Sequence, residues 1–108
     1  GEMTRAAHGC GPQDVFVTAN PNLGGAVNLT MSDPVNPFFG FGAKALGLPF
    51  CGCTIGHEWA LAFPGADLTF TIPVNPVFVG ADLLMQGLNV PGGPCPTLTD
   101  TITMTVGS

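Results

Sequence analysis

The segment TLTDTITMTVGS (Thr97–Ser108) alternates between apolar and hydroxyl side chains over most of its length. Threonine fills most of the positions between the apolar residues. Successive side chains of a β-strand point to opposite faces of the sheet, so this pattern gives one face for a core and one for water. We therefore predict a strand over residues 97–106. Its apolar face consists of Leu98, Ile102, Met104 and Val106.

The same alternation recurs in two other segments, DLTFTIP (67–73) and AVNLTMS (26–32). Threonine is β-branched and suits a pleated surface that is half exposed. Clusters of Gly, Pro, Asn and Asp separate these apolar runs, and no window favours a helix of more than a turn or two. The pattern predicts an all-β protein: a single antiparallel β-sandwich of Ig-like or Greek-key type with seven or eight short strands. Further strands are expected over residues 15–18, 38–46, 57–63 and 81–88.

The chain is poor in charge for a globular domain of 108 residues. Charged residues make up 8% of the sequence, and the net charge is -5, whereas a typical soluble domain has about 25% charged residues. Two cations cannot follow a phosphate backbone, so we expect no nucleic-acid partner. No apolar run reaches the ~18 residues of a membrane span, so we expect no membrane insertion. Charged side chains usually protect strand edges from pairing. Their scarcity favours association with neighbouring molecules or a surface covered by glycan.

Four cysteines in a short chain with few lysines predict two disulfides and an oxidising compartment. Cys51 and Cys53 are separated only by Gly52, which leaves too little chain for them to pair comfortably with each other. Either Cys10 joins Cys51 and Cys53 joins Cys95, or Cys10 joins Cys53 and Cys51 joins Cys95. Each bridge would close a loop of about forty residues and stabilise the fold by about 4 kcal/mol.

The segment PFCGCTIGHEW (49–59) suggests two chemical alternatives. A metal site could combine thiolates and imidazoles, but a C-x-C spacing does not suit zinc. Its ligands would come from His8, Cys10, Cys51, Cys53, His57 and Cys95. A catalytic set could combine Cys53, His57 and Glu58. Adjacent residues of a strand face opposite ways, however, so Glu58 could not orient the imidazole. We therefore expect disulfides, with no metal site, no catalytic residues and no enzymatic activity.

Two further features could modify or bind something at the surface. Asp33, Asp67 and Asp82 could converge on a calcium ion, but they form no dense acidic run, so no cofactor is predicted. Asn28 begins an N-x-[ST] sequon on the hydroxyl face of a predicted strand, which makes it a candidate glycosylation site. The many threonines could carry O-linked glycans.

The region LTFTIPVNPVFVGADLLMQGLNV (68–90), with an early GCG and the closing LTDTITMTVG, resembles a small secreted module of large surface proteins in environmental Gram-negative bacteria. That module has a strand ending in Ile-Pro, a short Asn-Pro turn, and a Val-Gly pair leading into a strand that ends in Gln. The resemblance implies an extracellular or cell-surface location and no catalytic residues. The module usually ends a larger polypeptide, and we expect it to act here as a subunit in its own right. The matching residues are Ile72, Pro73, Asn75, Pro76, Val79, Gly80 and Gln86.

Our leading hypothesis is a non-enzymatic extracellular structural protein that associates with copies of itself as a fibre or surface-layer subunit. The strand over residues 97–106 could complete the sheet of a neighbour. Residues 1–9, which include Met3, Ala6 and Ala7, could instead act as an inter-subunit arm outside a domain over residues 10–108. The alternative is a carbohydrate-binding or adhesive module. Its aromatic platform could come only from Phe38, Phe39 and Phe41, which we expect to fill the core.

Overall fold

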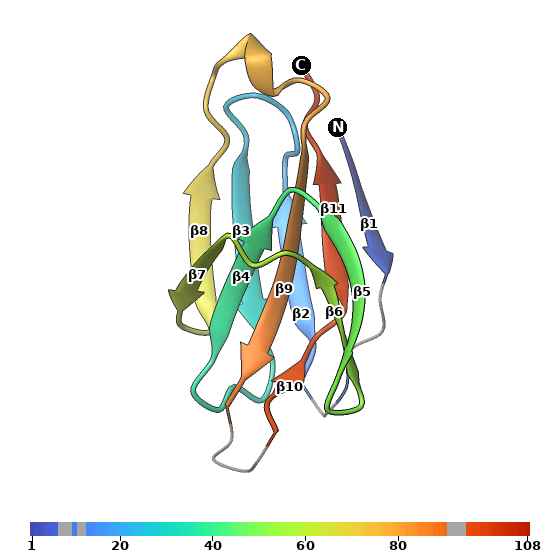
Figure 1. Ribbon diagram of the computed structural model, residues 1–108. Helices are drawn as coiled ribbons and strands as arrows, with labels where there is room; N and C mark the ends of the chain where they lie inside the picture. Colours follow the sequence, from blue (N-terminus) through green and yellow to red (C-terminus); the bar gives the residue numbers. More distant parts are fainter. Residues whose placement is uncertain (7–9, 11–12, 91–94) are drawn as a thin grey trace.

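The protein is a disulfide-stapled antiparallel β-sandwich, as the sequence predicts. The computed structural model describes residues 1–6, 10, 13–90 and 95–108. Two sheets face each other, and a hairpin lies in front of the larger sheet in the view of Figure 1. In these residues the secondary structure consists of eleven short strands and one 3-10 helix.

The larger sheet contains six strands in the order β1-β11-β9-β4-β7, with β10 paired to β9 beside this path. Both ends of the described chain contribute to it, because β1 pairs with β11. All its pairings are antiparallel. The strands are β1 (Glu2–Ala6), β4 (Phe38–Gly42), β7 (Leu61–Pro64), β9 (Asp82–Asn89), β10 (Thr97–Leu98) and β11 (Thr101–Thr105).

The smaller sheet contains three antiparallel strands in the order β2-β3-β8. A separate antiparallel hairpin is formed by β5 and β6. The 3-10 helix η1 (Pro76–Phe78) connects β8 to β9 and is capped by the Asn75 side chain, which accepts from the Val77 N–H at 3.1 Å. The strands are β2 (Val15–Ala19), β3 (Ala26–Met31), β8 (Asp67–Thr71), β5 (Ala45–Phe50) and β6 (Cys53–His57).

The strands are shorter and more numerous than expected, because three of the predicted strands are interrupted and the segment predicted as an arm forms β1. The predicted strand over 38–46 divides into β4 and β5, where the chain leaves the large sheet for the hairpin. The predicted strand over 57–63 ends at His57 and resumes at Leu61. The predicted strand over 97–106 breaks between β10 and β11, where the Thr99 hydroxyl accepts a hydrogen bond from the Gly87 N–H at 2.8 Å.

The core lies between the two sheets and is made by the alternating apolar faces that the sequence marks. Val27 and Leu29 of β3 are fully buried, and they face a large sheet whose inner residues include Phe39, Met85 and Met104. Burial of large apolar side chains is the main favourable contribution to folding a domain of this size. The apolar faces predicted for 26–32 and for the C-terminal region are therefore confirmed.

Candidate functional site

Two disulfides hold the β5–β6 hairpin to distant parts of the chain. Cys10 is bonded to Cys53, with Cα atoms 5.2 Å apart, and Cys51 is bonded to Cys95, with Cα atoms 5.8 Å apart. The structure thus selects the second of the two connectivities that the sequence leaves open. The four sulfurs are bonded in pairs, so neither a thiolate metal ligand nor a Cys53 nucleophile is present. His8, part of the metal alternative, lies outside the described residues.

The turn at the tip of the hairpin explains why both disulfides can form from one C-x-C segment. Cys51 and Gly52 have φ angles of 51° and 81°. Positive φ at both central residues is the signature of a type I′ turn, and glycine adopts it without steric cost. Phe50 and Cys53 are paired across the turn. The tight turn places Cys51 at the tip and Cys53 on β6, so the two cysteines connect to different parts of the chain.

His57 is fully buried between the hairpin and the large sheet. Its Nδ1 contacts the main-chain oxygen of Glu58, and its ring stacks on Trp59 with centroids 5.9 Å apart. Burial lowers the pKa of His57 below its ordinary value, although the carbonyl and the carboxylate of Glu58 oppose this shift. The Glu58 carboxylate accepts from the Ala43 N–H at 3.3 Å. His57 is thus a neutral structural histidine at neutral pH.

Gln86 joins the hairpin to the large sheet and is also fully buried. Its side-chain nitrogen donates to the carbonyls of Thr54 and Thr99, both at 2.9 Å. Its side-chain oxygen accepts from the Gly56 N–H at 3.3 Å and from the Trp59 indole at 3.4 Å. A buried amide with all its hydrogen bonds made fixes the neighbouring strands in one arrangement. Gln86 therefore anchors the hairpin to the large sheet.

The remaining candidate residues do not come together in one place. Among the described residues, no three side chains of His, Cys, Asp or Glu lie close enough together to hold a metal ion. Asp33, Asp67 and Asp82 therefore do not form the calcium site considered from the sequence. Asn28 is exposed on β3, and its amide donates to the Thr69 hydroxyl at 2.9 Å. Phe39 and Phe41 are buried in the core, as expected of the phenylalanine cluster. The expectation is wrong for Phe38, which is half-buried outside the core because neighbouring residues of a strand face opposite sides of the sheet.

The two terminal segments proposed as inter-subunit strands already pair within the same chain. β11 lies between β1 and β9, and the apolar side chains of the C-terminal region are buried. β1 forms an edge strand beside β11. Ala7, the last apolar residue of the predicted arm, lies outside the described residues. Donation of either segment to a neighbour would therefore require exchange of a strand that is paired in its own subunit.

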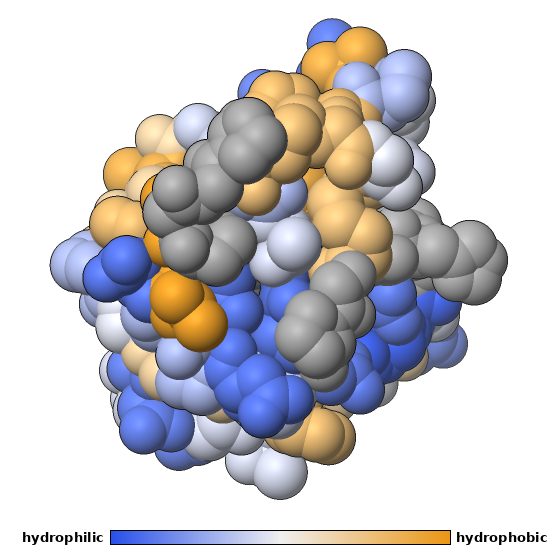
Figure 2. All heavy atoms as spheres, turned by 90° about the horizontal axis from the view of Figure 1, so that it is seen from below, coloured by the Kyte–Doolittle hydropathy of each residue, from blue (hydrophilic) through white to orange (hydrophobic). Residues whose placement is uncertain are grey.

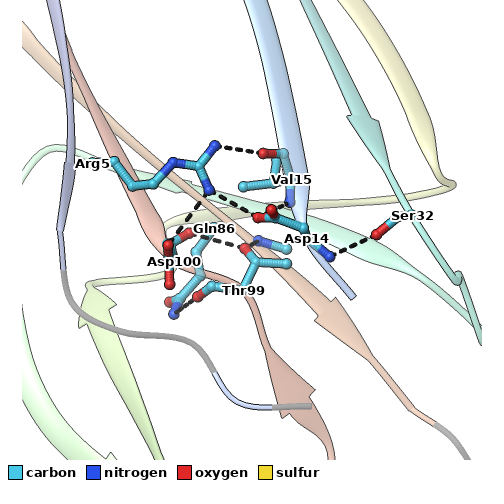
Figure 3. A network of polar contacts seen from close by, with 8 residues as sticks. Arg5, Asp14, Val15, Ser32, Gln86, Thr99 and Asp100 are labelled. Atoms are coloured by element: carbon cyan, nitrogen blue, oxygen red, sulfur yellow. Dashed lines mark hydrogen bonds and ion pairs between the residues drawn. The ribbon is translucent and has the colours of Figure 1, made fainter. Parts of the chain in front are cut away.

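We call the side of the sandwich formed by β1 and β2 the closed edge. Arg5 of β1 crosses from the large sheet to the small one and donates to the Val15 carbonyl at 2.7 Å. It also pairs with Asp14 at 2.8 Å and with Asp100 at 3.4 Å (Figure 3). The Asp14 N–H in turn donates to the Ser32 hydroxyl at 2.9 Å. The Arg5 side chain thus joins both sheets, and the Val15 carbonyl of β2 accepts a hydrogen bond from it.

We call the opposite side, formed by β7 and β8, the open edge. Only Gly65 and Ala66 separate these strands, so the chain crosses directly from one sheet to the other. Leu61 and Phe63 pair with the core residues Phe41 and Phe39, so they point toward the inside of the sandwich. They are nevertheless 60% and 42% exposed. The inner face of β7 is therefore only partly covered.

Beside β8 this incomplete cover leaves an apolar groove of about 330 Å³. A second groove of about 360 Å³ continues along the strand and shares Phe70 and Leu83 with the first. The Asp82 carboxylate at the second groove accepts from the Thr105 hydroxyl at 2.6 Å. Hollows of this size accommodate several large apolar side chains. The residues that line the first groove, called the apolar groove below, are Phe41, Leu61, Phe63, Leu68, Phe70 and Leu83.

The free main-chain groups of β8 can be identified from its neighbours. Ile72 donates to the Gly25 carbonyl and Ala66 accepts from the Met31 N–H, both at 2.9 Å. Hydrogen-bonding direction alternates along an antiparallel strand. Even-numbered residues of β8 therefore bond to β3, while the odd-numbered ones turn their N–H and C=O groups toward the open edge. These outward residues are Asp67, Thr69 and Thr71.

Some of the other strand edges in the described structure carry features that discourage pairing, whereas β8 combines few such features with an adjacent apolar groove. β7 contains Pro64 and β5 contains Pro49, and proline has no N–H to donate. The Val15 carbonyl of β2 is occupied by Arg5. β8 contains no proline and a single charged residue, Asp67 at its first position. The β8 edge beside the apolar groove is therefore the candidate functional site.

Hydrophobic residues are also exposed elsewhere, mostly on the hairpin and around η1. Figure 2 views the lower end of the molecule, where hydrophobic surface fills much of the upper part of the view and hydrophilic surface the centre and lower part. The exposed hydrophobic residues include Leu46, Leu48, Phe50, Val74, Val77 and Val79.

Comparison of this chain with protein-family models, curated proteins and solved structures finds no significant match. Within the part of the chain that the structure describes, no helix has the length and hydropathy needed to cross a membrane. Two disulfides are typical of proteins that fold in an oxidising, extracellular-type environment.

Sequence reasoning missed the open edge, although one signal was present. The segment FPGAD (63–67) is one of the Gly-, Pro- and Asp-containing clusters that predict a turn between strands. It joins strands of different sheets, so it aligns two sheet edges at one side of the sandwich. The prolines of β5 and β7 and the absence of proline from β8 could have indicated which edge was left free.

Proposed function

We propose that this protein is a non-enzymatic extracellular structural protein that associates with copies of itself through strand edges, as a subunit of a fibre or surface layer. The observation that carries the proposal is the β8 edge. It offers the outward main-chain groups of Asp67, Thr69 and Thr71 beside an uncharged apolar groove. Strand addition gains affinity from main-chain hydrogen bonds and specificity from alternate side chains that enter pockets.

Two further observations support self-association. The chain has only two cations and seven carboxylates in 108 residues, which is little charge to keep strand edges apart. Large hydrophobic side chains such as Leu61 and Val74 are 60% and 80% exposed. Exposed apolar surface of this kind is commonly covered by a partner. The disulfides would keep the fold intact in an extracellular setting.

Native mass spectrometry and analytical ultracentrifugation of the non-reduced protein test this function. We expect a concentration-dependent increase in mass above the 11.0 kDa of one chain, and ordered particles in electron micrographs. The mass after disulfide reduction serves as the reference for one chain and also reveals any attached glycan. A protein that stays monomeric up to millimolar concentration would refute the proposal.

A further inference from the structure

We propose that two copies of this chain pair through their β8 strands, antiparallel and about a twofold axis at Thr69. The proposal rests on the function proposed above and names the surface and register through which association begins. The small sheets β2-β3-β8 of the two copies would join into one continuous sheet of six strands. Such a contact is isologous, because each subunit uses the same surface.

The hydrogen-bonding pattern of β8 is self-complementary in this register. Thr69 would pair with Thr69 of the second copy, and Asp67 with Thr71 of the second copy at either end. All three residues turn their main-chain groups outward. Each such pair exchanges two hydrogen bonds, which gives about six main-chain hydrogen bonds across the contact. A twofold axis at Leu68 or Phe70 would instead centre the contact on residues whose groups already bond to β3.

Charge also favours this register. Asp67 is the single charged residue of β8, and it would lie opposite Thr71 of the second copy, so the two carboxylates are kept at opposite ends of the contact. Like charges directly opposite each other destabilise a sheet. The register that satisfies the main chain is thus also one that separates the negative charges.

The apolar side chains match as well. Between the hydrogen-bonded pairs, Leu68 of each copy would lie opposite Phe70 of the other on the inner face of the joined sheet. Both residues line the apolar groove, which also holds Leu61 and Phe63. The added strand would therefore cover the exposed inner face of β7. Pro64 limits pairing along the edge of β7, so the large sheets would not join in the same way.

Engineered cysteines test the register directly. At a twofold axis, Thr69→Cys places two thiols on one hydrogen-bonded pair with Cα atoms about 5.5 Å apart, within the range of a disulfide. Thr71→Cys is the matched control. It lies on the same exposed face of the same strand, but the two copies of residue 71 would be about 14 Å apart, beyond the reach of a disulfide.

We expect Thr69→Cys to form a covalent dimer under mild oxidation and Thr71→Cys to remain at least tenfold less cross-linked. A mixture of Asp67→Cys and Thr71→Cys should give the heterodimer, because these positions lie opposite each other. Peptide mapping of the Cys10–Cys53 and Cys51–Cys95 bonds verifies that each variant has the native fold.

Two results would overturn the inference while the proposed function stands. One is a wild-type protein that associates while Thr69→Cys does not cross-link. The other is equal cross-linking of Thr69→Cys and Thr71→Cys, which would show that the chains cross-link in random encounters and not in the proposed register. A wild-type protein that is monomeric throughout refutes both the inference and the proposed function.

Discussion

The closed edge and the open edge of this sandwich differ in whether side chains of the same subunit connect the two sheets there. At the closed edge, Arg5 bonds to Asp14, Asp100 and the Val15 carbonyl, and so holds β1 of one sheet to β2 of the other. At the open edge, β7 and β8 are joined only by the short chain between them. The apolar groove beside them contains no charged residue.

The closed edge contributes to folding, whereas the open edge is available for association. The closed edge uses one of the two cations of the chain to complete the fold within a single subunit. The open edge leaves main-chain groups and apolar side chains for which the described chain supplies no strand. An edge that is not protected by charge, proline or a bulge is a template for another strand. The following experiments perturb the fold and the two edges, beginning with the largest expected effect.

Removal of the Cys10–Cys53 bond should weaken the fold most. The double variant Cys10→Ala/Cys53→Ala releases a loop with a sequence separation of 43. It should lower the free energy of unfolding by about 4 kcal/mol in urea titrations. Cys51→Ala/Cys95→Ala is the matched control, with a separation of 44. A loss below about 1 kcal/mol would show that the contacts of Gln86 and Trp59 hold the hairpin without the bridge.

A charge at the open edge should weaken association with little effect on the fold. Thr69→Lys would place two lysines opposite each other at the proposed twofold axis, and like charges opposite each other disfavour strand pairing. We expect at least a tenfold increase in the dimer dissociation constant, measured by analytical ultracentrifugation. Thr18→Lys is the control, because Thr18 and Thr69 are both exposed and both pair with Asn28, on opposite sides of β3. Equal weakening by both variants would contradict pairing at β8.

Loss of the Arg5 contacts should make the closed edge resemble the open one. Arg5→Met removes both ion pairs and leaves the Val15 carbonyl without this donor. The expected loss of stability is about 1 kcal/mol, since the Arg5 side chain is 40% exposed. Lys44→Met, which removes the other cation, is the control for net charge. Chemical denaturation measures both variants, and the same stability for both would show that the Arg5 contacts contribute nothing.

Acid should destabilise the hairpin layer through His57. Burial lowers the pKa of His57 in the folded state, so the unfolded chain binds the proton more readily. Stability should therefore fall as the pH drops through the unfolded value of about 6.5, by at most about 1.4 kcal/mol per pH unit. The loss should level off below the pKa of the folded state. In thermal unfolding between pH 7.5 and 5.5, His57→Gln should lack this slope. A variant that retains the full slope would assign the proton to another group.

Much of the fold could be predicted because its information is local. Strand β3 was evident from the alternation of Val27, Leu29 and Met31 with polar residues, and the buried face of β11 from the same pattern. The hairpin was harder. Strand β5 of the hairpin is exposed along its whole length, although its sequence is mostly apolar. From the sequence, the segment Ala45–Phe50 therefore looks the same whether it continues β4 or forms a separate outer layer. The role of Gln86 as an anchor depends on partners such as Thr54 that are distant in sequence.

The sequence alone determined the class of fold, the need for two bridges and the scarcity of charge, because each follows from residue type and spacing. Tertiary structure decided which cysteines pair, which strand edge stays free and where Arg5 makes its contacts. These depend on which segments lie side by side after the chain has crossed between sheets. The alternation of apolar and polar residues determines which face of a strand is buried, but it does not determine which strands lie on either side of it. The open edge at β8 is a property of that arrangement.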